Sequence, residues 1–285
     1  MSPFGMAIVV PTLELFANEF QSNYSTIQFI ISAYLFGLAI AQPFMGFLSD
    51  KLGRKPIMIS GIILFIFASY ICMTSENLLT LIIARFFQGI GGSVGTVTSR
   101  AIIRDSYSGD MAAKSLSRVT ATMGMAPMIA PVVGALALSL TGSPNGIFMV
   151  TLFIGFAILI PVIFFLPETV IKSDLEREKS VWYKNYYKLL RSEIFVGSTF
   201  IYGFTTGSFF AILAVGSTVF SKNLGIDSTG FGLIWSSLTI LYASASFYAG
   251  SLTARIGLMR VLNLGVSLNL IAGFFFVLLI YFTGT

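Results

Sequence analysis

The stretch Gly46-Phe-Leu-Ser-Asp50-Lys51-Leu-Gly53-Arg54-Lys55 decides the fold, because it is a short charged segment between two long apolar runs. These runs, residues 26–48 and 56–75, are each long enough to cross a bilayer, which needs about 20 mostly apolar residues. We expect Gly46 to let two helices approach closely and Gly53 to adopt a conformation that closes a helix. An ordinary positive loop would need only the cations, and neither the glycines nor the aspartate.

The composition is that of a polytopic membrane protein. Of the 285 residues, 55% are hydrophobic and only 10% are charged. There is no histidine, and the single cysteine, Cys72, lies inside an apolar run, so we expect no metal site, no cofactor and no disulfide framework. An enzyme is the least expected class. We attribute the net charge of +5 to loops that orient the chain in the bilayer, and therefore expect no nucleic-acid partner.

The apolar runs predict an all-α membrane protein with about nine transmembrane helices. The predicted spans are residues 3–21, 26–48, 56–75, 78–103, 112–140, 146–166, 194–220, 229–251 and 261–282. The first six would form an N-terminal bundle over residues 1–167. Residues 168–193 would form a cytoplasmic linker with an amphipathic helix at the membrane surface, and residues 194–285 would form part of a second bundle.

The basic residues give the orientation of this map. Fifteen of the 17 fall on one side of the predicted membrane, Lys222 falls on the other, and Arg85 lies inside a helix. Loops rich in lysine and arginine remain in the cytoplasm. We therefore expect a multi-pass protein of the cell (inner) membrane with a cytoplasmic N-terminus.

The charged turn has a second, weaker copy. Gly250-Ser-Leu-Thr-Ala254-Arg-Ile-Gly257 matches the segment from Gly46 to Gly53 at a constant offset of 204 residues. Such an echo is typical of transporters built from two similar halves. Ala254 stands where the first copy has Asp50, so the two turns are not equivalent.

Arg85 is the one charge predicted deep inside a membrane helix. It follows the start of the 78–103 span by seven residues, which is about 10 Å along a helix axis. An unpaired charge at that depth costs at least about 2.5 kcal/mol. Arg85 must therefore pair or face water, unless its side chain extends to the outer headgroups.

Several motifs carry a resemblance to a known family. The pattern Gly-x-Leu-x-Asp-x-x-Gly-Arg-Lys resembles the loop motif between the second and third helices of major facilitator superfamily transporters. Arg85-Phe-Phe-Gln-Gly resembles the fourth-helix motif of drug/proton antiporters, and Arg104-Asp105 and Leu166-Pro-Glu-Thr resemble the bicyclomycin-resistance (Bcr/CflA) exporters. The resemblance implies the major facilitator fold and proton-coupled efflux of small amphipathic drugs by alternating access. Its partners would be the substrate, protons and the lipid bilayer, and the protein would work as a monomer.

The resemblance also implies roles for particular residues. Arg85 would couple transport to protons, and Asp50 would form a charge relay with Arg100, which could equally be a plain orientation charge. The remaining candidates are Gly46, Gly53, Arg54 and Lys55 in a cytoplasmic gate, Ala130, Pro131 and Gly134 in an antiporter-type fifth helix, and Tyr34, Gln42 and Met123 in the substrate cavity. The last two sets could instead be helix-packing residues.

The chain also departs from that family. Its members have twelve helices and an aspartate in the first helix where this chain has Ala7, so the chain looks shortened. Two alternatives therefore stay open: a metabolite or nutrient carrier of the same fold, and a membrane protein without transport activity. A flux assay in proteoliposomes would separate them.

Overall fold

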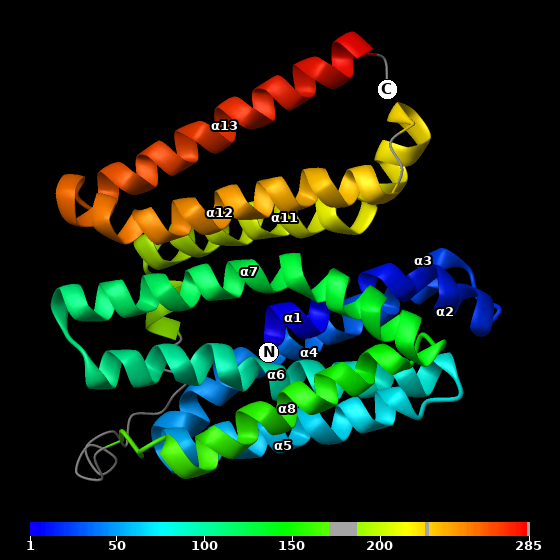
Figure 1. Cartoon of the computed structure of the whole chain (residues 1–285). Helices are drawn as coiled ribbons and strands as arrows, with labels where there is room; N and C mark the ends of the chain where they lie inside the picture. The colour runs from blue at the N-terminus through cyan, green and yellow to red at the C-terminus, as the bar shows by residue number, and fades with distance from the viewer. Residues whose placement is uncertain (171–186, 226–227, 284–285) are drawn as a thin grey trace. The chain divides into compact units, whose positions relative to one another are not determined.

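A computed structural model describes residues 1–170, 187–225 and 228–283 of the chain (Figure 1). All regular structure in these residues is helical. The chain divides into two compact units, Met1–Lys179 and Ser180–Thr285. Each unit is described by itself below. The linker helix expected within residues 168–193 falls largely outside the described residues.

Unit 1 contains the helices that precede the linker. They are α1 (Ser2–Ala7), the 3₁₀-helix η1 (Val10–Thr12), α2 (Leu13–Glu19), α3 (Tyr24–Ile27), α4 (Phe29–Leu52), α5 (Arg54–Met73), α6 (Leu78–Ser106), α7 (Gly109–Thr141) and α8 (Gly146–Phe165). Within the described residues, five helices are long and apolar enough to span a membrane: α3 continued by α4, then α5, α6, α7 and α8. These correspond to the second to sixth predicted spans.

The first predicted span is interrupted. Where one helix was expected over residues 3–21, the structure has α1, η1 and α2 in succession. Pro11 lies at the break, inside η1. Proline has no N–H to donate, and its ring collides with the carbonyl oxygen one turn earlier, so a continuous α-helix cannot pass through this position without a break or kink.

Helices α4 and α6 pack closely through two glycines. A Cβ atom on Gly37 would lie 2.1 Å from the carbonyl oxygen of Phe86, and a Cβ atom on Gly89 would lie 2.1 Å from that of Tyr34. Gly46 has no such role, because a Cβ atom there would meet only the side chain of Val97, at 3.6 Å. The expectation that Gly46 permits close helix approach was therefore wrong.

Unit 2 contains α11 (Glu193–Leu224), α12 (Ser228–Ile256) and α13 (Leu258–Thr283), which match the last three predicted spans. The repeat at offset 204 is visible in the backbone. Gly53 ends α4 with a φ of +103°, and Gly257 follows α12 with a φ of +88°. Gly53 was expected to take the left-handed turn conformation that closes a helix; its φ is positive as expected, but its ψ of 151° lies outside that conformation. Its partner in the second half, Gly257, also has a positive φ.

Candidate functional site

Arg85 lies in the middle of unit 1 and is completely buried, with 0% of its surface exposed. Its Nε atom donates to the carbonyl oxygen of Ile30 on α4 at 3.2 Å. Its Nη1 atom donates to the carbonyl oxygen of Gly5 on α1 at 2.9 Å and to Oε1 of Gln88 at 2.6 Å. The charge is therefore held by groups from α1, α4 and α6, and it does not extend to the membrane surface.

Gln88, also fully buried, ties Arg85 to two further helices. Its Nε2 atom donates to Oγ of Ser69 on α5 at 2.7 Å and to Oγ1 of Thr151 on α8 at 3.2 Å. These hydroxyls in turn donate to carbonyl oxygens of their own helices, those of Phe65 and Phe148. Every polar atom of the glutamine is thus hydrogen-bonded, which fixes the orientation of its amide.

Two aromatic rings flank the guanidinium. The centre of the Arg85 guanidinium lies 4.3 Å from the centroid of the Tyr34 ring and 5.9 Å from that of Phe148. The Tyr34 hydroxyl donates to the carbonyl oxygen of Ser2 at 3.0 Å, and the Ser2 hydroxyl lies 2.7 Å from Oγ1 of Thr96. Aromatic faces attract cations, so these rings compensate part of the buried charge.

The Arg85 cluster is incomplete at one atom. Nη2 of Arg85 is buried and has no hydrogen-bond partner among the residues that the structure describes. The described ion pairs include none to Arg85. A fully buried guanidinium is thus held by carbonyl oxygens, one amide and aromatic rings, with no carboxylate beside it.

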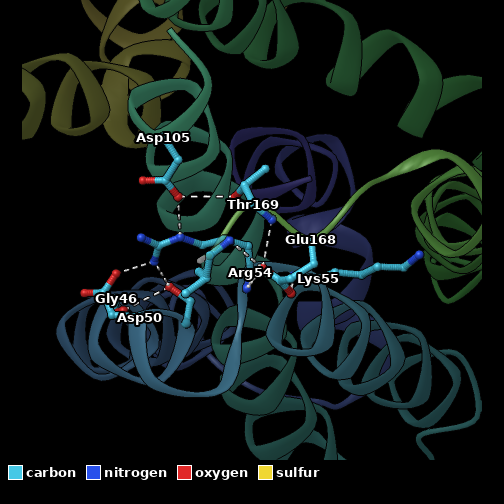
Figure 2. A network of polar contacts seen from close by, with 9 residues as sticks. Gly46, Asp50, Arg54, Lys55, Asp105, Glu168 and Thr169 are labelled. Atoms are coloured by element: carbon cyan, nitrogen blue, oxygen red, sulfur yellow. Dashed lines mark hydrogen bonds and ion pairs between the residues drawn. The ribbon is translucent and has the colours of Figure 1, made fainter. Parts of the chain in front are cut away.

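A second polar cluster surrounds Arg54 at the first turn of α5 (Figure 2). Its guanidinium forms ion pairs with Asp50 on α4 and with Asp105 at the end of α6, the second through Nε at 2.9 Å. Its Nη1 atom also donates to the hydroxyl of the buried Ser49 at 2.8 Å. Arg54 therefore joins the ends of three helices.

The segment after α8 completes this network. The carboxylate of Glu168 accepts from the backbone N–H groups of Arg54 at 2.9 Å and Lys55 at 3.1 Å, at the start of α5 (Figure 2). It also accepts from those of Thr169 and Val170. Partial burial raises the pKa of the Glu168 carboxyl, but these four hydrogen bonds outweigh it and leave the pKa below its ordinary value.

Thr169 adds a further link, because its hydroxyl donates to Oδ2 of Asp105 at 3.2 Å. Gly53 lies directly under the Glu168 carboxylate: a Cβ atom there would come within 2.6 Å of Oε2. The positive φ favours glycine at this position, and a larger residue would also displace the Glu168 carboxylate.

The structure changes one expected pairing. Asp50 was expected to pair with Arg100, but it pairs with Arg54, four residues along the chain. Arg100 is exposed on α6, and no described contact joins it to Asp50. Asp50 lies in the last turn of α4, and Arg54 follows the tight turn at Gly53, so the shorter connection supplies the cation.

The remaining predicted residues separate into two groups. Tyr34 belongs to the Arg85 cluster, whereas Gln42 and Met123 are partly exposed and form no described hydrogen bond with it. On α7, Ala130 is buried, and a Cβ atom on Gly134 would lie 2.5 Å from the carbonyl oxygen of Ile8. Together with Pro131, which lies inside α7, these residues belong to a helix that packs tightly on the start of the chain.

Sequence reasoning did not assign several residues that the structure places in these clusters, among them Gln88, Ser69, Asp105 and Glu168. Gln88, Asp105 and Glu168 stand inside motifs with recognisable residues, and that was their only signal. Ser69 lies in an apolar run and carries no signal of its own. Among the described residues, no group of three or more histidine, cysteine or acidic side chains could hold a metal ion.

Comparison with known proteins gives the family. The family model described as Major Facilitator Superfamily matches residues 1–285. The chain is 25% identical over 279 residues to the bicyclomycin resistance protein homolog of Haemophilus influenzae, covering 98% of this chain and 70% of the relative. It is 31% identical over 294 residues to the multidrug resistance protein MdtL of Shigella dysenteriae, covering 95% of this chain and 74% of that relative.

The chain is also similar to transporters that are named for other functions. The riboflavin transporter RibZ of Clostridioides difficile is 32% identical over 164 residues, which cover 58% of this chain and 35% of that protein. The crystal structure of the human organic anion transporter MFSD10 matches with a TM-score of 0.64 and 18% identity, over 85% of this chain and 62% of that one, which shows the fold alone. The family match over the whole length, together with the apolar helices of unit 1, shows that this chain is a multi-pass membrane protein and belongs to the major facilitator superfamily of transporters.

Proposed function

We propose that this chain exports small amphipathic compounds across the cell (inner) membrane by alternating access, in exchange for protons. The observation that carries the proposal is the burial of Arg85, a permanent charge with 0% exposure that five helices surround with polar and aromatic groups. Charges inside membrane segments are costly and usually mark a transport pathway, so a buried arginine at this position favours a transport role.

The export of drugs is inferred from relatives. Two of the relatives that match most of this chain are named for bicyclomycin resistance and multidrug resistance. The antiporter-like residues of α7, Ala130, Pro131 and Gly134, favour exchange over one-way transport by resemblance. We also propose that the coupling ion is the proton, that the chain works as a monomer and that its N-terminus lies in the cytoplasm.

We assign a gating role to the network around Arg54. Its ion pairs join α4, α5 and α6, and Glu168 fastens the segment after α8 to the start of α5 (Figure 2). A network at helix ends can break and re-form as helices move, whereas the Arg85 cluster lies within the packed interior. Lys55 contributes its backbone N–H to this gate, and Gly46 contributes the carbonyl oxygen that accepts from Ser49. Gly53 provides the turn beside the Glu168 carboxylate.

The alternative function is the carriage of a nutrient or metabolite. The similarity to a riboflavin transporter favours it, but that similarity covers 58% of this chain, against 95% and 98% for the two resistance proteins. The site itself does not separate the two functions, since both need a polar group at mid-membrane.

The test is a flux assay with purified chain in proteoliposomes that hold an entrapped pH-sensitive dye and an imposed proton gradient. Three probes of similar size and different charge are used: anionic naphthalene-2-sulfonate, neutral naphthalene-2-sulfonamide and cationic N-methylquinolinium. We expect at least one probe to move faster than in empty liposomes and to collapse the proton gradient as it moves. No flux and no proton movement with any probe would overturn the proposal and favour a chain without transport activity.

A further inference from the structure

No described ion pair joins Arg85 to a carboxylate of unit 1. The carboxylates whose side chains the structure describes are exposed and lie at helix ends or in turns: Glu14, Glu19, Asp50, Glu76, Asp105 and Glu168. The chain also has no histidine. Within the described part of unit 1, therefore, no acidic side chain is placed to neutralise the buried guanidinium.

The guanidinium itself has unused donors. Arginine has five N–H groups, and Arg85 uses three of them, on Ile30, Gly5 and Gln88. The two hydrogens of Nη2 have no partner among the described residues, although the atom is buried. A charged donor that is buried without a partner costs free energy. The other polar groups of the cluster are already hydrogen-bonded to one another, so none of them serves as an acceptor for Nη2.

The cluster is also built to hold this arginine still. Hydrogen bonds to Ser69 on α5 and Thr151 on α8 fix the side chain of Gln88. Both Gln88 and the carbonyl oxygen of Gly5 accept from Nη1 of Arg85. The guanidinium carbon of Arg85 lies over the Tyr34 ring, 4.3 Å from its centroid. A rigid cation with one nitrogen free, Nη2, can donate a charge-assisted hydrogen bond to an oxygen of an anion.

We propose that Arg85 is the binding group for an anion, and that this anion is the negatively charged group of the transported compound. The substrate class is then an amphipathic organic anion, a carboxylate or sulfonate on an apolar body. The oxyanion would accept from Nη2, and the aromatic rings of Tyr34 and Phe148 would lie next to its apolar part. This inference rests on the proposed transport function, because it places the transported compound at Arg85, the buried charge on which that proposal depends.

The short helix α1 closes off Arg85 at the start of the chain. Helix α1 has six residues, and two of its carbonyl oxygens, those of Gly5 and Ser2, are bonded to Arg85 and Tyr34. Because Arg85 is closed off in this structure, an anion reaches it only after these elements separate. An incoming oxyanion can replace the carbonyl oxygen of Gly5 as the acceptor for Nη1, so opening does not leave that donor unpaired.

Binding is tested on the full chain, purified in a non-ionic detergent without added lipid. The thermal unfolding midpoint is measured with naphthalene-2-sulfonate and with the neutral naphthalene-2-sulfonamide at equal concentration and ionic strength. We expect the sulfonate to raise the midpoint and the sulfonamide to leave it unchanged, since a ligand stabilises the state that it binds. Chloride and phosphate are measured alongside, because an inorganic anion offers the same charge.

Variants locate the binding site. Arg85→Gln is expected to weaken sulfonate binding by about tenfold or more, the size of one charge-assisted hydrogen bond. Arg85→Lys keeps a charge without the planar edge, is expected to weaken binding as well, and serves if Arg85→Gln does not fold. Arg104→Gln is the matched control, because it removes one exposed arginine from the last turn of the same helix. Its binding should be that of the unsubstituted chain.

The outcomes separate cleanly. A sulfonate shift that persists in Arg85→Gln, that the sulfonamide matches, or that is absent from the unsubstituted chain overturns the inference. A shift that chloride or phosphate reproduces in full and Arg85→Gln abolishes supports the anion site but overturns its assignment to the transported compound. Binding as expected without any flux in the proteoliposomes would leave the anion site standing and overturn the proposed transport instead.

Discussion

The backbone N–H of Arg54 donates to the carboxylate of Glu168 at 2.9 Å, across 114 positions of the chain. This bond caps the first turn of α5, whose leading N–H groups have no partner within the helix. The N-cap residue of α5 is Gly53, which has no side chain that could accept from these N–H groups. The cap therefore comes from the segment after α8, which ties the end of unit 1's last helix to the turn between α4 and α5.

Replacing Glu168 tests this cap. Glu168→Ala should lower the free energy of unfolding at neutral pH by about 1 kcal/mol, the usual cost of losing a helix cap. The matched control is Glu76→Ala, which changes an exposed glutamate in the turn between α5 and α6. Equal losses in the two variants would contradict the capping role.

The same carboxylate predicts an acid sensitivity. The pKa of Glu168 in the folded chain lies below its ordinary value of 4.5, so its contribution is fully present above about pH 4.5 and is lost as the pH falls through the lowered pKa. In Glu168→Gln this part of the pH dependence should disappear. The check is thermal unfolding in detergent from pH 6 down to pH 3, with Glu76→Gln keeping the full dependence.

The two ion pairs of Arg54 should differ in strength. The Asp105 side chain is 26% exposed and the Asp50 side chain 55%, while that of Arg54 is 8% exposed. Water screens the more exposed pair, so double-mutant cycles should give a coupling of about 1 kcal/mol for Arg54 with Asp105 and less for Arg54 with Asp50. The reverse order would show that Asp50 is the main partner of this arginine.

Glycine substitutions separate packing from turn geometry. Gly89→Ala should destabilise the chain by about 1–3 kcal/mol, because the new methyl group would overlap the carbonyl oxygen of Tyr34. Gly46→Ala should be tolerated, since the methyl group would only touch Val97. Thermal unfolding of the two variants side by side measures the difference, and an equal loss would refute the packing assigned to α4 and α6.

Gln88→Glu tests whether a negative charge inside the protein can take the place of a bound anion at Arg85. It places a carboxylate next to Nη1 of Arg85 and so supplies inside the protein the negative charge that we assign to the substrate. The variant should fold and should lose the thermal shift with naphthalene-2-sulfonate. Gln88→Met, of similar length but uncharged, is the control. A variant Gln88→Glu that binds the sulfonate as tightly as the unsubstituted chain would argue against an anion at Arg85.

Much of the fold could be predicted from the sequence, because membrane spans are read from length and apolarity alone. The helices α4 to α8 and α11 to α13 lie where the apolar runs placed them. The first span was predicted as one helix, but the chain breaks at Pro11. Helices α4, α7 and α8 continue through their own prolines, so the sequence did not show which proline ends a helix. The echo at Gly257 was visible because a positive φ selects glycine in both halves.

The sites were less predictable, for a physical reason. Arg85 was identifiable because a charge inside an apolar run is rare, but its partners are carbonyl oxygens and small hydroxyls that any helix contains. Asp50 was matched with the wrong arginine because sequence does not show which cation a tight turn brings nearest. Glu168 lies at the far end of unit 1, and only the fold brings it to α5.

The most direct test of the account is the rate of naphthalene-2-sulfonate flux, with the accompanying proton movement, in proteoliposomes of three chains: unsubstituted, Arg85→Gln and Arg104→Gln. We expect equal flux and proton movement for the unsubstituted chain and Arg104→Gln. We expect a loss of about tenfold or more for Arg85→Gln, down towards the level of empty liposomes. Flux through Arg85→Gln at the unsubstituted rate would contradict the claim that transport depends on this buried charge.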